Sequence, residues 1–337
     1  MSELHHVGEQ LLPSIAYGDA RGLPTETMSA SDIAKRYGSL DHLIPPRDNP
    51  YYPGDFPAGT TSDDTQLSVA VAEALMVADG FDIKAQAAEH LRVYRATPKT
   101  KNFKGEMSVR GWGGSTTASM ERLASGVSPL ASGEKEGAGN GILMKMSPLV
   151  VWQAAEQTDT QTRHRHYDEL TTMTHDSEIA RACTRLHGDV SFWLLDHPGV
   201  SVDEFREHAL EIVALEPNAD PKKRIERALR YPTHSLTQLV GRYAYGQANG
   251  HYGFYVPNTV AMTYDVFMAA SGEYGTAVDY AVNLGGDTDS IASIAGTMAN
   301  AWSAGEFELP ADFARVQDYN RLSRLSHQFA QKALHLS

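Results

Sequence analysis

The sequence has a single cysteine, no long apolar run and fewer basic than acidic residues. Cys183 has no second cysteine for an intrachain disulfide, which is typical of a protein from a reducing compartment. Apolar runs such as 74–78 and 149–152 fall far short of the roughly 20 residues that a membrane helix needs. The first ten residues are polar and lack the pattern of an export signal. We therefore expect a soluble, cytoplasmic protein with no membrane partner.

The shortage of positive charge limits the classes of partner. Lys and Arg number 29 against 42 Asp and Glu, a formal net charge of −13 at pH 7. Such a chain repels a phosphate backbone, so we expect no specific nucleic-acid binding. An acidic surface is compatible with an enzyme that requires cations.

Helical periodicity is the main structural pattern in the chain. Leu67, Val71, Leu75 and Ala78 recur at the spacing of a buried helical stripe, which predicts a helix over 64–78. A second helix is predicted to begin with Asp82 as its cap, to run to Tyr94 and to end before Thr97–Pro98. Similar spacing or composition predicts helices over 176–195, 201–215, 222–229, 259–270, 276–283 and 290–304.

The rest of the pattern favours a single all-α domain. Strand-like alternation is scarce, and the connections are short and rich in Gly, Pro, Asn and Asp. Neither a low-complexity linker nor a fixed-period repeat divides the chain. With 42% hydrophobic residues the chain can bury a large core, so we expect one compact helical bundle over residues 1–337.

Two acidic clusters stand out because each directly precedes a predicted helix. They are Ser62-Asp63-Asp64 and Asp287-Thr288-Asp289-Ser290. Each alone is explained by helix capping. Together they supply four carboxylates and two hydroxyls, more than two helix starts need, and such hard oxygen ligands suit Mg²⁺, Mn²⁺ or Ca²⁺. Bound cations would offset the mutual repulsion of the carboxylates, and two ions are plausible at a site of this composition.

Several motifs in one order carry a family resemblance. The segments S-D-D-T-Q (62–66) and G-G-D-T-D-S-I-A-S-I-A-G (285–296) occur with G-D-A-R-G-L-P-T-E (18–26), R-G-W-G (110–113) and G-N-G (139–141). This combination, which spans roughly residues 8–305, resembles the ADP-ribosylglycohydrolase family. The resemblance implies a compact orthogonal helical bundle and hydrolysis of an ADP-ribosyl bond at the anomeric carbon. It also implies a dinuclear Mg²⁺ or Mn²⁺ centre at the base of a cleft.

The resemblance assigns residues to that centre. The implied metal ligands are Ser62, Asp63, Asp64, Asp287, Asp289 and Ser290. Glu26 would lie at the same centre, although a solvated loop acid is the alternative. Asp63 or Asp289 is our candidate for the group that accepts the proton of the attacking water, and Glu26 is the competing candidate.

The substrate-binding candidates come from glycine-containing loops. Backbone N–H groups of Gly139, Asn140 and Gly141 are positioned by the motif to contact a diphosphate, although Gly-rich turns are common. His175 is a hydrogen-bond partner for a phosphate or hydroxyl, or else a helix cap.

Aromatic residues beside glycines are the remaining candidates. Trp112, and Tyr255 in the loop that contains Gly253, are expected to stack an adenine or cover the cleft; packing on the core is the alternative.

A few positions depart from the family pattern. Ser62 and Ser290 stand where threonine is frequent, but each keeps a hydroxyl. Lys145 stands where an arginine is usual, and a lysine cannot make the two parallel hydrogen bonds that an arginine makes to a phosphate. Arg21 replaces a small apolar residue, which predicts a more positive cleft rim. These departures affect the expected substrate preference and leave the reaction class unchanged.

Two other functions remain open. Isoprenoid synthases also use paired aspartates with Mg²⁺, but their D-D-x-x-D pattern is not completed after Asp64. A non-catalytic ADP-ribose reader would be expected to lose ligands, whereas all six positions are present. We expect a monomer that acts on an ADP-ribosylated protein or a small ADP-ribose adduct. Arginine, serine, nucleobase and O-acyl leaving groups all stay possible.

Overall fold

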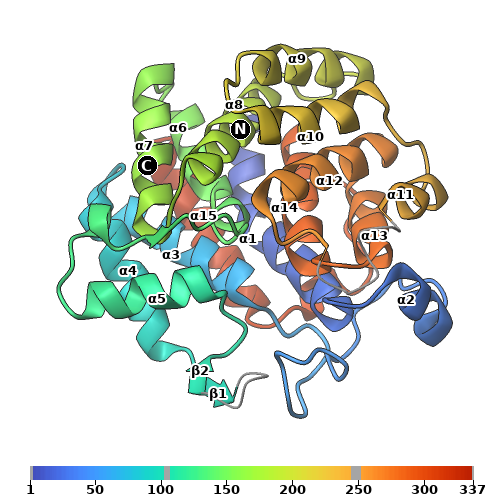
Figure 1. Cartoon of the computed structure of the whole chain (residues 1–337), viewed down its shortest axis with the longest axis horizontal. Helices are drawn as coiled ribbons and strands as arrows, with labels where there is room; N and C mark the ends of the chain where they lie inside the picture. The colour runs from blue at the N-terminus through green and yellow to red at the C-terminus, as the bar shows by residue number, and fades with distance from the viewer. Residues whose placement is uncertain (1–2, 102–106, 244–251, 336–337) are drawn as a thin grey trace.

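Helices form most of the chain in the computed structural model, which describes residues 3–101, 107–243 and 252–335 (Figure 1). The helices of the first half are α1 (Glu3–Gly22), α2 (Ala30–Tyr37), α3 (Asp63–Ala78), α4 (Ile83–Ala96), α5 (Gly114–Ala124), α6 (Ser147–Ala155) and α7 (Thr160–Thr174). Those of the second half are α8 (Glu178–Asp196), α9 (Val202–Ala214), α10 (Ala219–Arg230), α11 (Leu236–Tyr243), α12 (Val256–Ala269), α13 (Tyr274–Leu284), α14 (Thr288–Trp302) and α15 (Tyr319–Ala333). The prediction of an all-α fold is confirmed.

Short elements complete the chain. The 3₁₀ turns are η1 (Leu23–Thr25), η2 (Pro129–Ala131), η3 (Leu143–Lys145) and η5 (Phe313–Arg315). The strands are β1 (Lys99–Lys101), β2 (Met107–Val109), β3 (Glu134–Lys135) and β4 (His175–Asp176). β1 and β2 pair antiparallel, with Lys99 opposite Val109, and β3 and β4 pair parallel. The sequence pattern predicted no strands, because elements this short are too brief to show alternation.

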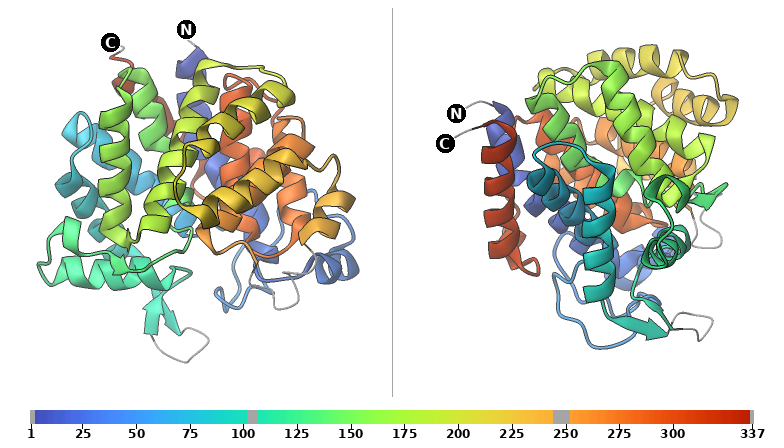
Figure 2. Two further views of the ribbon diagram at one scale, coloured as in Figure 1. Left: turned by 45° about the horizontal axis from the view of Figure 1, so that its top comes forward. Right: turned by 90° about the vertical axis from the view of Figure 1, so that its left-hand side faces the viewer.

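Helix α1 is the central element of the fold. It packs against α14, α15, α3 and α13, and almost every side chain after its first turn is buried. Small residues permit these close approaches. A Cβ at Gly8 would lie 2.8 Å from Ala330 Cβ on α15, and a Cβ at Gly22 would lie 2.4 Å from Asp289 Cα on α14. Figure 2 shows α15, in red, alongside the blue α1.

The helices predicted from periodicity are present with small shifts at their ends. α3 begins at Asp63, so Asp63 and Asp64 stand at its start as predicted, and Ser62 caps it by accepting a hydrogen bond from the N–H of Asp64. Asp82 caps α4 as predicted, by accepting from the N–H of Ala85. The helix predicted over 176–195 begins instead at Glu178, because Ser177 is its cap.

The sequence pattern did not predict seven of the observed helices, namely α1, α2, α5, α6, α7, α11 and α15. The clearest case is α1, which contains Pro13 as well as Gly8 and Gly18. Proline and glycine inside a helix weaken its intrinsic propensity, so this helix depends on burial of its surface by its neighbours. Among the described residues, no helix is long and apolar enough to cross a membrane.

Candidate functional site

The two acidic clusters lie at one cavity of about 560 Å³. Asp63 and Asp64 come from the start of α3, and Asp287, Asp289 and Ser290 come from the start of α14. Other lining residues come from the loops before and after α2, strands β1, β2 and β4, the start of α5, η3 with the loop before it, and the loop before α12. They include Glu26, Tyr51, Lys101, Ser108, Trp112, Gly113, Ser115, Thr116, Asn140, Met144, His175 and Phe254.

Asp19 holds the α3 cluster in place from the central helix. Its carboxylate accepts hydrogen bonds from the backbone N–H of Ser62, at 3.0 and 2.9 Å, and from the N–H and hydroxyl of Thr65, at 3.1 and 2.5 Å. Asp19 and the Ser62 hydroxyl together therefore accept from the N–H groups of Ser62, Asp64 and Thr65 at the start of α3. The carboxylates of Asp63 and Asp64 are left to line the cavity.

The α14 cluster follows a tight double-glycine turn. Gly285 and Gly286 have φ of +82° and +85°, a region that favours glycine, and a Cβ at Gly286 would lie 2.1 Å from the carbonyl oxygen of Tyr252. The Asp287 side chain makes no capping hydrogen bond to α14. Instead it accepts one of 2.6 Å from the Asn140 amide. The alternative that Asp287 is only a helix cap therefore does not fit its geometry.

The clusters meet through short contacts. The Ser290 hydroxyl donates to Asp64 Oδ2 at 3.3 Å, and Ser62 Oγ lies 3.2 Å from the same oxygen. Carboxylate oxygens of Glu26, Asp287 and Asp289 lie within 4.8 Å of one another, and all three residues are buried. Segments more than 200 residues apart thus converge at one site.

Burial and mutual repulsion raise the pKa values of these carboxylates. Desolvation is the largest cause of the shift at each carboxylate. The pKa of Asp63 is raised to about 7, first by desolvation and then by the charge of Asp19. The pKa values of Asp64, Asp289 and Glu26 are raised well above their ordinary range, first by desolvation and then by neighbouring carboxylates. The only Lys or Arg among the described lining residues is Lys101, on the β1 strand.

These residues fit divalent cations. Asp64 Oδ1 is buried and has no hydrogen-bond partner among the described residues. A buried acceptor without a partner destabilises the fold unless a ligand such as a cation binds it. The surrounding donors are carboxylate and hydroxyl oxygens, which suit Mg²⁺ or Mn²⁺. A cation would also offset the repulsion that raises the pKa values.

The predicted substrate-binding residues fall into two groups. Gly139, Asn140, Gly141, His175 and Trp112 line the cavity. Gly253 and Tyr255 are not among its lining residues: a Cβ at Gly253 would lie 2.9 Å from Asp287 Cβ, and the Tyr255 hydroxyl donates to Asp220 at 2.7 Å.

The G-N-G loop differs in detail from the expectation of free N–H groups. The Asn140 N–H donates to the Phe254 carbonyl at 3.1 Å, so it is not available to a diphosphate. His175 lies beneath this loop, with its Cε1 3.2 Å from where a Gly141 Cβ would be. Burial lowers the pKa of His175 to about 3, so the ring is neutral at pH 7 and acts as a hydrogen-bonding group without charge.

Two of the departures from the family pattern lie away from the cavity surface. Arg21 is buried and donates to Asp279 at 2.7 Å and to the Tyr17 hydroxyl at 2.9 Å, so it does not make the cleft rim more positive. Lys145 is buried, and its Nζ donates to Thr174 Oγ1 at 3.3 Å. Neither side chain is among the described residues that line the cavity.

Sequence reasoning missed three contributors to the site. The sequence marks Asp19 only as part of the G-D-A-R-G-L-P-T-E motif and gives no sign that it holds the start of α3. Asn49, which donates to Glu26 Oε2 at 2.7 Å, had no recognisable signal. The start of α5, at Gly113 and Gly114, also lines the cavity. A helix N-terminus attracts anions through its free N–H groups.

Comparisons with known proteins identify the family and the fold. The sequence pattern of a family described as ADP-ribosylglycohydrolase matches residues 12–335. An uncharacterized protein of Archaeoglobus fulgidus is 27% identical over 288 residues, which cover 85% of this chain and 84% of the relative. A solved structure described as an ADP-ribosylglycohydrolase-related protein complex has a similar fold. Its TM-score is 0.72 at 20% identity, over 98% of this chain and 99% of that one.

Proposed function

This chain belongs to the ADP-ribosylglycohydrolase family, and we propose that it hydrolyses an ADP-ribosyl glycosidic bond with the help of two divalent cations. Family membership supports the glycohydrolase class. The main support for a metal-dependent reaction is the contact between Ser290 and Asp64, which joins both acidic clusters at the cavity.

Two Mg²⁺ or Mn²⁺ ions would be held by Ser62, Asp63, Asp64, Asp287, Asp289 and Ser290. When bound, such ions lower the pKa of a bound water and polarise a substrate oxygen. The chain's own buried carboxylates favour the oxocarbenium-like transition state of glycoside cleavage, because that state carries positive charge on the sugar ring.

A carboxylate at this cavity accepts the proton of the attacking water. Asp63, Asp289 and Glu26 are the candidates, since all three line the cavity. A base works best when its pKa is close to the working pH. Asn49 orients Glu26, and Asn140 orients Asp287, so the acidic group is held in place before a substrate arrives.

The rest of the cavity suits a nucleoside diphosphate. The backbone N–H groups of Gly114 and Ser115 at the start of α5, together with Lys101 on β1, provide positive charge for the diphosphate. Trp112 is buried and held by a hydrogen bond of 2.9 Å from its indole Nε1 to Gln66 Oε1; the part of it that lines the cavity would contact the adenine. The substrate would be an ADP-ribosylated protein or a small ADP-ribose adduct.

A substrate panel tests this proposal. Release of ADP-ribose would be measured from ADP-ribosylated arginine, serine and nucleobase substrates and from O-acyl-ADP-ribose, each with Mg²⁺, with Mn²⁺ and with a chelator. We expect turnover of at least one substrate, lost on chelation and restored by metal. Binding of ADP-ribose without turnover of any substrate, in the presence of metal, would favour a non-catalytic reader.

A further inference from the structure

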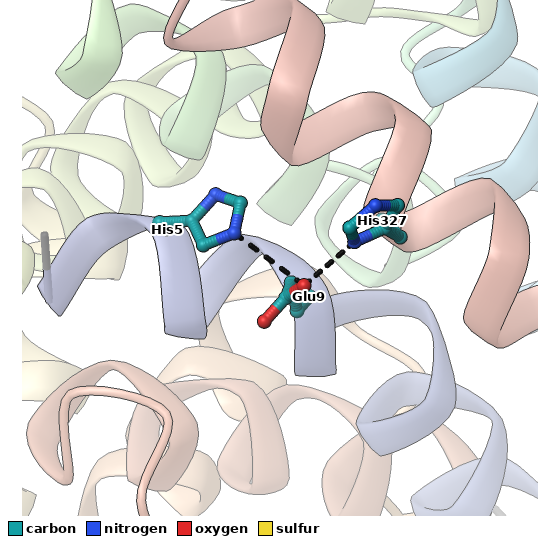
Figure 3. Close-up of side chains that lie close together, drawn as sticks. All are labelled: His5, Glu9 and His327. Atoms are coloured by element: carbon teal, nitrogen blue, oxygen red, sulfur yellow. Dashed lines mark hydrogen bonds and ion pairs between the residues drawn. The ribbon is translucent and has the colours of Figure 1, made fainter. Parts of the chain in front are cut away.

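A second group of potential metal ligands lies where the first helix meets the last. His5 and Glu9 occupy successive turns of α1, and His327 comes from α15 (Figure 3). Both imidazoles face the same carboxylate oxygen: His5 Nε2 is 3.4 Å and His327 Nδ1 is 2.6 Å from Glu9 Oε1. None of the three residues lines the cavity of the acidic clusters.

Close helix packing fixes the positions of the three side chains. Ser326, the residue before His327, donates through its hydroxyl to the Gly8 carbonyl at 2.8 Å and accepts from the Leu12 N–H at 3.0 Å. Because Gly8 has no side chain, Ala330 comes so close that a Cβ at Gly8 would lie 2.8 Å from its Cβ. The backbones of α1 and α15 are therefore held in position by contacts that do not involve His5, Glu9 or His327.

The donor distances are close to those of a metal site. Imidazole nitrogens and carboxylate oxygens lie about 2.0–2.1 Å from Zn²⁺, which places the donors of a tetrahedral site roughly 3.3 Å apart. The distance from His5 to Glu9 already has this value. The ligand atoms of all three residues lie within 4.8 Å of one another, so side-chain movements that bring the donors closer by up to about 1.5 Å would complete the set.

His5 is buried beside this carboxylate oxygen. Its side chain is only 4% exposed, so the ring is held with Nε2 toward Glu9 Oε1. Its Nδ1 has no hydrogen-bond partner among the described residues and would carry the ring proton when Nε2 binds an ion. His327, at 50% exposed, leaves a path for an ion and for a water as a fourth ligand.

We propose that His5, Glu9 and His327 bind one zinc-class ion, Zn²⁺ in particular, which clamps α15 to α1. Two nitrogens with one carboxylate select Zn²⁺ over Mg²⁺, whereas the oxygen-only clusters at the cavity have the opposite preference. This site is separate from the proposed glycohydrolase centre, and its existence does not depend on the proposed function.

Zn²⁺ titration of the full chain by calorimetry, in excess Mg²⁺ to fill the oxygen sites, tests the proposal. We expect one Zn²⁺ per chain, and a loss of affinity of at least roughly 100-fold in His327→Ala and in Glu9→Gln, since even groups that only support a ligand contribute 10- to 100-fold. His6→Ala is the matched control, because His6 faces Glu306 instead, at 3.4 Å, and its variant should bind as the wild type does.

Co²⁺ provides a second readout that does not depend on stability or turnover. In the wild type we expect the intense visible absorption of four-coordinate Co²⁺, and in His327→Ala its loss. His327 is half exposed, so this variant should fold normally, which far-ultraviolet circular dichroism would check. Failure of the wild type to bind Zn²⁺ in excess Mg²⁺, or unchanged affinity in His327→Ala, would overturn the proposal. Neither result would bear on hydrolysis at the cavity.

Discussion

The Ser290 hydroxyl donates a hydrogen bond of 3.3 Å to Asp64 Oδ2, across a separation of 226 positions in the sequence. The contact depends on α1, which packs against both helix starts. Asp19 on α1 binds the backbone at the start of α3, and Gly22 on α1 lets the start of α14 approach. The central helix thus sets the distance between the two halves of the acidic site.

Asp289→Asn tests the acidic site directly. We expect ADP-ribose release to fall by at least roughly 100-fold, the scale of losing one preorganised electrostatic group. The metal-free variant should nevertheless be more stable at pH 7, because a buried carboxylate with a raised pKa is replaced by a neutral amide. Turnover assays and chemical denaturation measure the two effects.

The matched control for this variant is Asp203→Asn. Asp203 lies on α9 with its side chain 81% exposed, so neither activity nor stability should change measurably. Full turnover by Asp289→Asn would contradict the role of the acidic clusters.

Metal addition should stabilise the chelated protein. Mg²⁺ or Mn²⁺ at 100 times its dissociation constant adds about 2.7 kcal/mol to the free energy of unfolding, because it binds only the folded state. The unfolding temperature, followed by circular dichroism, should rise by several degrees in the wild type and much less in Asp289→Asn. An equal rise in both proteins would place the ion elsewhere.

Gly22→Ala should separate α1 from α14. Its new Cβ would lie 2.4 Å from Asp289 Cα, a contact with backbone that only a helix shift can relieve. We expect a loss of about 1–3 kcal/mol in stability and a loss of activity, since Asp289 moves with α14. The control is Gly241→Ala on α11, where nothing lies within 4 Å of the new Cβ. That variant should be equally or more stable, by up to about 1 kcal/mol.

His187 should make the fold sensitive to acid. Burial lowers its pKa from 6.5 to about 4 in the folded state. As the pH falls below about 6.5 the unfolded chain therefore binds a proton that the folded chain does not, and stability decreases until about pH 4. Between pH 7 and pH 5 this one group lowers the free energy of unfolding by about 2 kcal/mol.

His187→Gln should remove that part of the pH dependence, measured as the difference in unfolding free energy between pH 7 and pH 5. The buried carboxylates at the cavity have raised pKa values and act in the opposite direction, so only the difference between the two proteins isolates His187. An identical loss in both proteins would show that His187 does not titrate on unfolding.

Local patterns predicted much of the helical structure and the donor chemistry. The caps at Asp82 and Ser62 and the stripe along α3 depend on residues a few positions apart, so they can be recognised in the sequence. The same is true of the carboxylates in 62–64 and 287–290 and of the family motifs.

The tertiary structure determined the contacts between segments that are distant in the sequence, which no local pattern predicts. Helix α1 forms despite Pro13 and its glycines, because its neighbours bury it. Asn49 meets Glu26, and His327 meets Glu9, through packing of segments that are distant in the sequence. The sequence by itself determined which oxygen donors are available and that the chain is helical. Their convergence at one cavity was decided by packing, because hydrogen bonds and close contacts between distant segments leave no periodic pattern along the chain.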